Sequence, residues 1–193
     1  MSKKTFYIFR HGETDFNKEG RWQGAGHNPE LNLAGIAQAH ILAETLRPYG
    51  LQKIYSSPLK RALQTAEIIG EVLSLPVEIK ESLIEGNFGV NEGQYHKDII
   101  QTEEYKNWRN LDAEYIHFRF EGGESKYEIM QRMFTAISEM LNTPEEIIGI
   151  SSHSAAIRCL MLQFGIQMGR LENGALLRLT YDDGHWFEEE LKD

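Results

Sequence analysis

The chain has 193 residues, 41% of them hydrophobic and 25% charged, a composition typical of a folded globular protein. The formal net charge of −9 argues against general nucleic-acid binding, because little positive charge is available to neutralise a phosphate backbone. The single cysteine, Cys159, excludes an intramolecular disulfide and a cysteine-based metal cluster. Because Cys159 lies in an apolar run, we expect a small buried core residue there and not a nucleophile.

The length predicts a single domain over residues 1–193. No apolar stretch is long enough to span a membrane, and the N-terminal residues lead into a predicted strand, not into the apolar region of a signal peptide. We therefore expect a cytoplasmic protein with no membrane partner. No feature of the sequence favours a dimer over a monomer.

Strand and helix patterns alternate along the first eighty residues. Short β-rich runs predict strands at 5–9, 53–56 and 77–79. Ser57 and Pro58 are typical of a helix cap and first turn, so a helix is expected over 59–73. Another helix is expected over 34–47, on the helical spacing of five residues that would face the core: Leu33, Ile36, Ala37, His40 and Ile41.

The second half continues the alternation after an irregular segment. Residues 93–121 are polar and aromatic, with a helix expected near 97–108, and we expect them to cover the site. The later patterns predict an amphipathic helix at 125–141, a buried strand at 146–151 and a helix at 154–163. They also predict a hairpin of two strands at 175–181 and 185–191. This order predicts a three-layer α/β/α sandwich whose mainly parallel sheet has an antiparallel edge.

The strand at 5–9 ends in Arg10-His11-Gly12-Glu13-Thr14. Ligands of α/β proteins bind at the carboxyl ends of strands, so a basic residue and an imidazole there suit a doubly charged anion such as phosphate. Gly12 would let the backbone turn tightly and approach a ligand. Three further segments could converge on this edge: 57–66, which opens a helix with an anion-favouring N-terminus, 83–93 and 152–154.

Together these segments resemble the histidine phosphatase superfamily, also called the phosphoglycerate mutase-like family, from Phe6 to about Arg158. Arg10 to Thr14 with Asn17 is similar to the family's complete first motif. The other matches are Arg21-Trp22-Gln23-Gly24, common in a broad phosphatase branch, Ser57-Pro58 with Arg61-Ala62 and Thr65-Ala66, Leu83 and Glu85 with Gly89 and Glu92-Gly93, and Gly122-Gly123-Glu124-Ser125.

The resemblance implies a phosphoglycerate mutase-like fold and a mechanism that uses neither a metal nor a cofactor. His11 would attack phosphorus and form a phosphohistidine, and Glu85 would act as general acid and base. Arg10 and Arg61 would bind the phosphate with their planar guanidinium groups. His153 would stabilise the charge on the phosphoryl oxygens.

Three further residues are candidates for contact with phosphate or substrate. Asn17 would be a neutral donor, although it could instead form an Asx turn. Gln23 is interpreted either as a substrate contact or as a packing residue. Ser154 stands where the family usually has glycine, and its Cβ would restrict the backbone if a positive φ were needed there. Because its backbone N–H remains, we expect a modified phosphate site and not an abolished one.

The predicted activity is hydrolysis of a small phosphorylated substrate. Family mutases usually carry a longer basic segment with paired arginines, whereas 93–121 holds only four non-adjacent basic residues, Lys97, Lys106, Arg109 and Arg119. A shorter segment excludes less water from the site, so transfer of the phosphoryl group to water should prevail over its return to the substrate. The alternatives are phosphoglycerate mutase-type phosphoryl transfer and a non-catalytic phosphate-binding protein, for which Ser154 is the only sequence hint.

Overall fold

A six-stranded sheet forms the centre of the computed structural model, which describes residues 3–189. The strand order is β3-β2-β4-β1-β5-β6. The first four strands in the chain run parallel: β1 (Lys4–Arg10), β2 (Lys53–Ser56), β3 (Val77–Ile79) and β4 (Ile147–Ser152). The hairpin of β5 (Leu176–Asp182) and β6 (His185–Glu189) adds an antiparallel edge. The predicted mixed sheet is thus confirmed.

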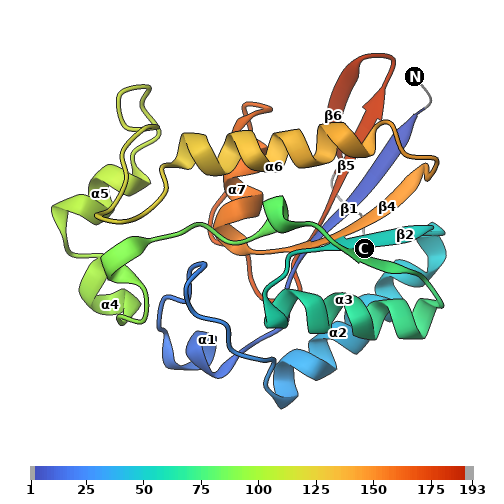
Figure 1. Ribbon diagram of the computed structural model, residues 1–193, viewed down its shortest axis with the longest axis horizontal. Helices are drawn as coiled ribbons and strands as arrows, with labels where there is room; N and C mark the ends of the chain where they lie inside the picture. Colours follow the sequence, from blue (N-terminus) through green and yellow to red (C-terminus); the bar gives the residue numbers. More distant parts are fainter. Residues whose placement is uncertain (1–2, 190–193) are drawn as a thin grey trace.

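Helices cover both faces of the sheet, which confirms the three layers (Figure 1). One face carries α2 (Leu33–Leu46) and α3 (Lys60–Leu73), and the other carries α6 (Lys126–Met140) and α7 (Ser154–Leu162). Three short helices gather beyond the carboxyl ends of β1 and β4: α1 (Asp15–Glu19), α4 (His96–Ile99) and α5 (Glu103–Arg109). Single 3₁₀ turns lie at Arg47–Tyr49, Glu81–Leu83 and Gly89–Asn91. In the described chain, residues 3–189, no helix could span a membrane.

The core lies on both sides of the sheet. The amphipathic pattern of α6 is confirmed, since the four residues that predicted its inner face are all buried: Ile129, Met133, Ile137 and Met140. They pack with Phe6, Ile8 and Ile150 of the sheet. Each such side chain contributes about 1.5–3 kcal/mol when it is fully removed from water. Cys159 belongs to this core, and burial raises the pKa of its thiol to about 12, so it is suited to packing and not to attack.

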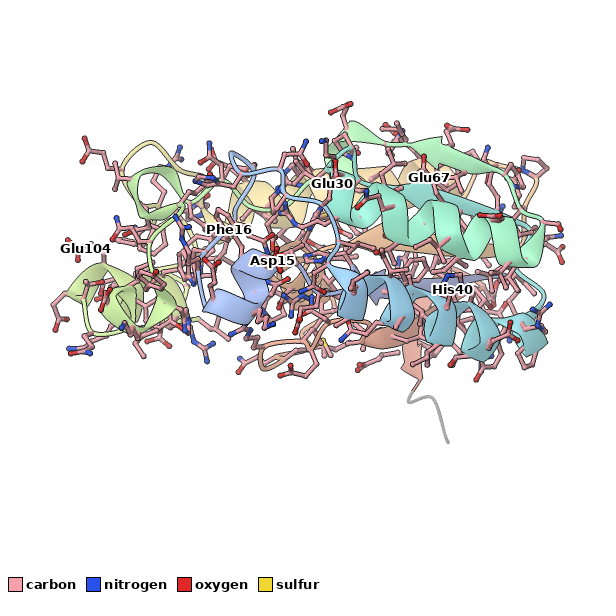
Figure 2. All side chains as sticks on the ribbon, turned by 90° about the horizontal axis from the view of Figure 1, so that it is seen from below. Asp15, Phe16, Glu30, His40, Glu67 and Glu104 are labelled. Carbon is pink, nitrogen blue, oxygen red and sulfur yellow. The ribbon has the colours of Figure 1, made fainter. Side chains whose placement is uncertain are left out.

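The predicted inner face of α2 is wrong. Leu33 and Ile41 are 86% and 67% exposed, and Ile36, Ala37 and His40 are exposed as well. The buried face carries smaller residues and two leucines, namely Gly35, Ala39, Leu42, Ala43 and Leu46. Because α2 is apolar on nearly every side, hydrophobic spacing did not identify its inner face. Figure 2 looks onto this side of the molecule, with α2 and α3 in front of the sheet and His40 labelled.

A close contact between α2 and the loop after β1 selects that face. A Cβ on Gly35 would lie 2.1 Å from the Glu13 carbonyl oxygen, and one on Gly12 would lie 2.4 Å from the Gly35 carbonyl oxygen. Neither glycine has a positive φ. Gly12 is therefore required by helix packing and not by the tight turn that the sequence suggested.

Two local expectations also differ from the structure, and one short helix was not expected. The helix expected over 59–73 begins at Lys60 with Leu59 at its N-cap, so Ser57 and Pro58 do not cap it. The single helix expected near 97–108 is two, because Thr102 caps α5 by accepting from the Tyr105 N–H. No pattern in the sequence predicted α1. The last residues of the expected strand at 185–191 lie outside the described residues.

Gly35→Ala should destabilise the fold, because the added methyl would collide with backbone that cannot move independently. We expect a loss of about 1–3 kcal/mol in the free energy of unfolding, measured by urea denaturation. Gly169→Ala is the matched control, since a Cβ at Gly169 would meet no other atom within 4 Å and this glycine has no positive φ. Equal stabilities for the two variants would contradict the packing argument.

Candidate active site

A cavity of about 180 Å³ opens at the carboxyl ends of β1 and β4. Seven of the eight predicted site residues line it: Arg10, His11, Asn17, Gln23, Arg61, Glu85 and Ser154. The eighth, His153, lies behind the wall and is fully buried, with its ring centroid 5.1 Å from that of His11. The register explains this pairing, because Arg10 and Ser152 are partners in the parallel β1–β4 ladder and each histidine follows directly.

The backbone carbonyl oxygen of the next residue, Gly12, fixes the His11 ring in one tautomer. Nδ1 lies 2.6 Å from the Gly12 carbonyl oxygen, which can only accept, so Nδ1 carries the proton and Nε2 keeps its lone pair. Burial, together with the charges of Arg61 and Arg10, holds the pKa of His11 well below its usual value. The ring is consequently neutral near pH 7 and able to act as a nucleophile.

His153 is held from a different element. Its Nε2 lies 2.7 Å from the Ser57 hydroxyl, which follows β2. Burial, then Arg61 and His11, lower the pKa of His153 well below the usual value. Sequence reasoning gave Ser57 a helix-capping role, and the structure gives it this imidazole as a partner.

Arg10 and Arg61 are both buried beside the histidines. Arg10 donates through Nη1 to the Leu171 carbonyl oxygen at 2.5 Å, and Arg61 donates to the carbonyl oxygens of Gly24 and His27 at 2.8 Å each. Burial lowers the pKa of each guanidinium to about 10, so both remain charged at neutral pH. The remaining N–H groups of both side chains can still donate to an anion.

Beside His11, three buried nitrogens have no hydrogen-bond partner among the described residues: Arg10 Nε, Arg61 Nε and His153 Nδ1. A buried polar atom left unpaired costs about 1–3 kcal/mol. Their concentration around His11 is the arrangement expected of a site whose remaining partners are the oxygens of an anion.

The Glu85 carboxylate sits at the N-terminus of α7. Oε1 accepts from the N–H groups of Gly86 and Ala156 at 2.9 Å, and Oε2 accepts from Ala155 at 3.3 Å. Arg132 on α6 holds the preceding turn, since its guanidinium donates to the Glu85 carbonyl oxygen at 2.9 Å and to those of Ser82 and Ile84. The carboxylate therefore stands at a fixed place on the cavity wall.

Asn17 and Gln23 combine structural contacts with a place in the cavity. Asn17 completes a capping box with Thr14 at the start of α1, so its side chain has a structural contact, although not the Asx turn considered from the sequence. Gln23 accepts from the Thr14 hydroxyl at 2.9 Å. Only the oxygens of the two amides are used in these contacts, which leaves both NH₂ groups as donors toward the cavity they line.

Ser154 causes none of the strain considered from the sequence. It is the first residue of α7, and it has no positive φ. Its hydroxyl accepts from the Leu171 N–H at 3.2 Å and so fastens the segment after α7 to the start of the helix. The Ser154 side chain thus positions the backbone at Leu171, a role that the sequence motif does not indicate.

The cover at 93–121 contributes one side of the cavity. His96, Tyr105, Trp108 and Arg109 line it, whereas Tyr95, Tyr115 and Phe118 do not. The buried Lys126 of α6 holds the cover in place, donating to the carbonyl oxygens of Trp108 and Tyr115 at 2.7 and 2.9 Å. Sequence reasoning missed Lys126 and Arg132, because a lysine or arginine that binds carbonyl groups looks like a surface charge in the sequence.

Comparison with known proteins shows the family to which the chain belongs. The sequence profile of the histidine phosphatase superfamily (branch 1) matches residues 6–193. The chain belongs to this superfamily. Similar curated proteins within it include the probable phosphoglycerate mutases GpmB of Citrobacter koseri and of Yersinia pestis, each 34% identical over 188 residues that cover 93% of this chain and 86% of the relative.

Several solved structures are similar to this superfamily member, and two of them are named as phosphatases. A mycobacterial glucosyl-3-phosphoglycerate phosphatase complexed with VO₃ is 25% identical with a TM-score of 0.86, covering 97% of this chain and 98% of its own. A phosphoserine phosphatase from Entamoeba histolytica, complexed with 3-phosphoglyceric acid, is 26% identical with a TM-score of 0.82, covering 97% and 96%. Bacillus stearothermophilus YhfR is 27% identical with a TM-score of 0.83, covering 96% and 95%.

The low pKa of His153 predicts a pH-dependent stability. Unfolded histidine protonates near pH 6.5, so below that pH the unfolded chain binds more protons than the folded one, and the free energy of unfolding falls with the pH. His153→Asn should reduce the fall between pH 7.5 and 5.5 by about 1 kcal/mol, measured by urea denaturation. Ser57→Ala, which keeps the imidazole, should retain the fall. An equal fall in wild type and His153→Asn would contradict the assignment.

Proposed function

We propose that the protein is a phosphomonoester hydrolase that acts through a phosphohistidine on His11. The observation that carries the proposal is the neutral His11, with Nε2 available and two buried arginines beside it. The phosphoryl group would bind between Arg10, Arg61 and the amide of Asn17. His153 would donate through Nδ1 in the tautomer whose Nε2 accepts from Ser57.

Two displacements at phosphorus complete the proposed reaction. In the first, His11 Nε2 forms the N–P bond, the ester P–O bond breaks, and Glu85 gives its proton to the leaving oxygen. In the second, Glu85 takes a proton from water, which attacks phosphorus, and the N–P bond breaks to release inorganic phosphate. The charge on the phosphoryl oxygens is balanced by side-chain cations, so the proposal requires no metal ion.

Phosphoglycerate mutase-type transfer is the second candidate, favoured by the similarity to the GpmB proteins. It shares the phosphohistidine and differs in the fate of the phosphoryl group, which returns to the substrate. A purely phosphate-binding role would leave the paired placement of His11 and Glu85 without a use.

Phosphate release from a panel of phosphomonoesters, with a strong chelator present, tests the proposal. His11→Ala should abolish release, and Glu85→Gln should slow it by about 10²–10⁴-fold through loss of proton transfer. Glu81→Gln, an exposed carboxylate four residues away, is the matched control and should keep the wild-type rate.

Two results would decide against hydrolysis, and a third would decide against its metal-independent mechanism. Phosphorus NMR of 3-phosphoglycerate that shows isomerisation without phosphate release would favour the mutase. Phosphate binding without turnover by folded protein would favour the binding role. Activity lost with chelator and restored by a divalent cation would contradict the metal-independent mechanism.

A further inference from the structure

The segment between α7 and β5 returns to the end of β1, where His11 lies. The chain turns at Gly174, whose φ of 76° is a conformation that favours glycine. The Gly174 N–H donates to the Arg10 carbonyl oxygen at 3.2 Å, and the Arg10 N–H donates to the Ala175 carbonyl oxygen at 2.9 Å. This turn brings the side chain of Asn173 against the first motif, although 162 positions separate Asn173 from His11 in the sequence.

The side-chain amide of Asn173 joins two parts of the proposed phosphate site. Its Nδ2 donates to the His11 carbonyl oxygen and to Oδ1 of Asn17, both at 3.1 Å. A backbone carbonyl oxygen can only accept, so the contact with His11 determines which end of the Asn173 amide is the nitrogen. Both N–H groups of this amide are therefore used, one for the end of β1 and the other for α1.

The contact with Asn173 supports one orientation of the Asn17 amide. Oδ1 of Asn17 accepts from Asn173 and also from the Thr14 N–H at 3.2 Å. Because both donors lie on the oxygen side, the NH₂ group of Asn17 remains for the cavity that this residue lines. A rotated amide would turn its nitrogen toward two N–H donors and its oxygen toward a bound anion. Asn17 can thus donate to a phosphoryl oxygen in the orientation that Asn173 supports.

Helix α1, which carries Asn17, depends on such contacts for its position. It has five residues, and none of them is buried. A short helix without a buried face gains little from hydrophobic packing. The Phe16 ring contacts the loop that follows α1, and Asn32 donates to Asp15 at 3.4 Å in an exposed contact. The bond from Asn173 adds a connection between α1 and the strand end that carries the nucleophile.

The backbone on either side of Asn173 is itself anchored. The Leu171 carbonyl oxygen accepts from the Arg10 guanidinium at 2.5 Å, and the Leu171 N–H donates to the Ser154 hydroxyl at 3.2 Å. On the other side, the Gly174 N–H bonds to the end of β1. Asn173 therefore has a fixed position from which it can orient a neighbouring group before the substrate binds.

We propose that Asn173 is a positioning residue for the phosphate site, which orients the Asn17 amide so that it donates to the phosphoryl group that His11 attacks. The inference rests on the proposed function, and it adds a residue that lies beyond the segments with motif resemblance. Asn173 is not among the described residues that line the cavity, so its effect on phosphate passes through Asn17. A donor that is oriented in advance stabilises developing charge without a cost of reorganisation.

Two measurements test the role of Asn173: the calorimetric dissociation constant of inorganic phosphate and kcat/KM for a hydrolysed ester. Asn173→Ala removes the donors and should worsen each value by about 10-fold. Asn173→Leu fills a similar volume without a donor and should lose as much. Asn142→Ala is the control, because this exposed asparagine lies between α6 and the amino end of β4, and it should keep both values.

A double-mutant cycle tests whether the effect passes through Asn17. Once Asn17 is replaced in Asn17→Ala, the further change Asn173→Ala should cost less than about 3-fold in either measurement. Independent roles would instead multiply the two losses. Urea denaturation shows that each variant is folded. A general effect of Asn173→Ala on the fold would appear in both backgrounds, whereas loss of the proposed orientation would appear in one.

The outcomes separate this proposal from the hydrolase. If His11-dependent phosphate release is observed but Asn173→Leu keeps the wild-type values, or if the two losses multiply, the positioning role is refuted and the hydrolase stands. If no ester is hydrolysed, the hydrolase fails, and the phosphate dissociation constants decide the positioning role by the same criteria. A folded wild-type protein that binds no phosphate would refute the positioning role as well.

Discussion

The burial of positive charge beside His11 is the constraint on which the site depends. Arg61 is fully buried and Arg10 nearly so, and both remain charged at neutral pH because the pKa of each guanidinium is still about 10, while their N–H groups donate to backbone carbonyl oxygens. Their charges, added to burial, keep the His11 imidazole neutral. One arrangement thus serves two requirements of phosphoryl transfer, since the cations that attract the anion also preserve the lone pair that would attack it.

The same contacts organise the loop that surrounds the phosphate end. Arg61 holds the carbonyl oxygens of Gly24 and His27, while the Glu92 carboxylate accepts from the N–H groups of Ala25 and Gly26 between them. The carbonyl oxygens of the loop are therefore bound by a cation, and its N–H groups are bound by an anion. Removal of Arg61 would release loop structure as well as an anion contact, so its effect on activity would combine the two.

The cavity has one side built on the sheet and one side formed by the cover. Residues after β1 and β4 are anchored by the sheet, whereas Lys126, whose pKa burial lowers to about 8, helps to hold the cover at Trp108 and Tyr115. A change in the cover would therefore alter that side of the cavity without disturbing His11.

The architecture and the motif residues could be predicted from the amino-acid sequence. The β-rich runs, the face of α6 and the order of elements are local properties, and the residues at strand ends share an edge once the strands are parallel. Contacts between residues that are far apart in the sequence could be identified only from the folded structure. The inner face of α2 follows from backbone contact with Gly12, Ser57 binds His153 across 96 residues, and Ser154 anchors Leu171. Lys126 and Arg132 look like surface charges in the sequence, and the fold gives them backbone carbonyl oxygens as partners, because hydrogen bonds depend on distance in space and not along the chain.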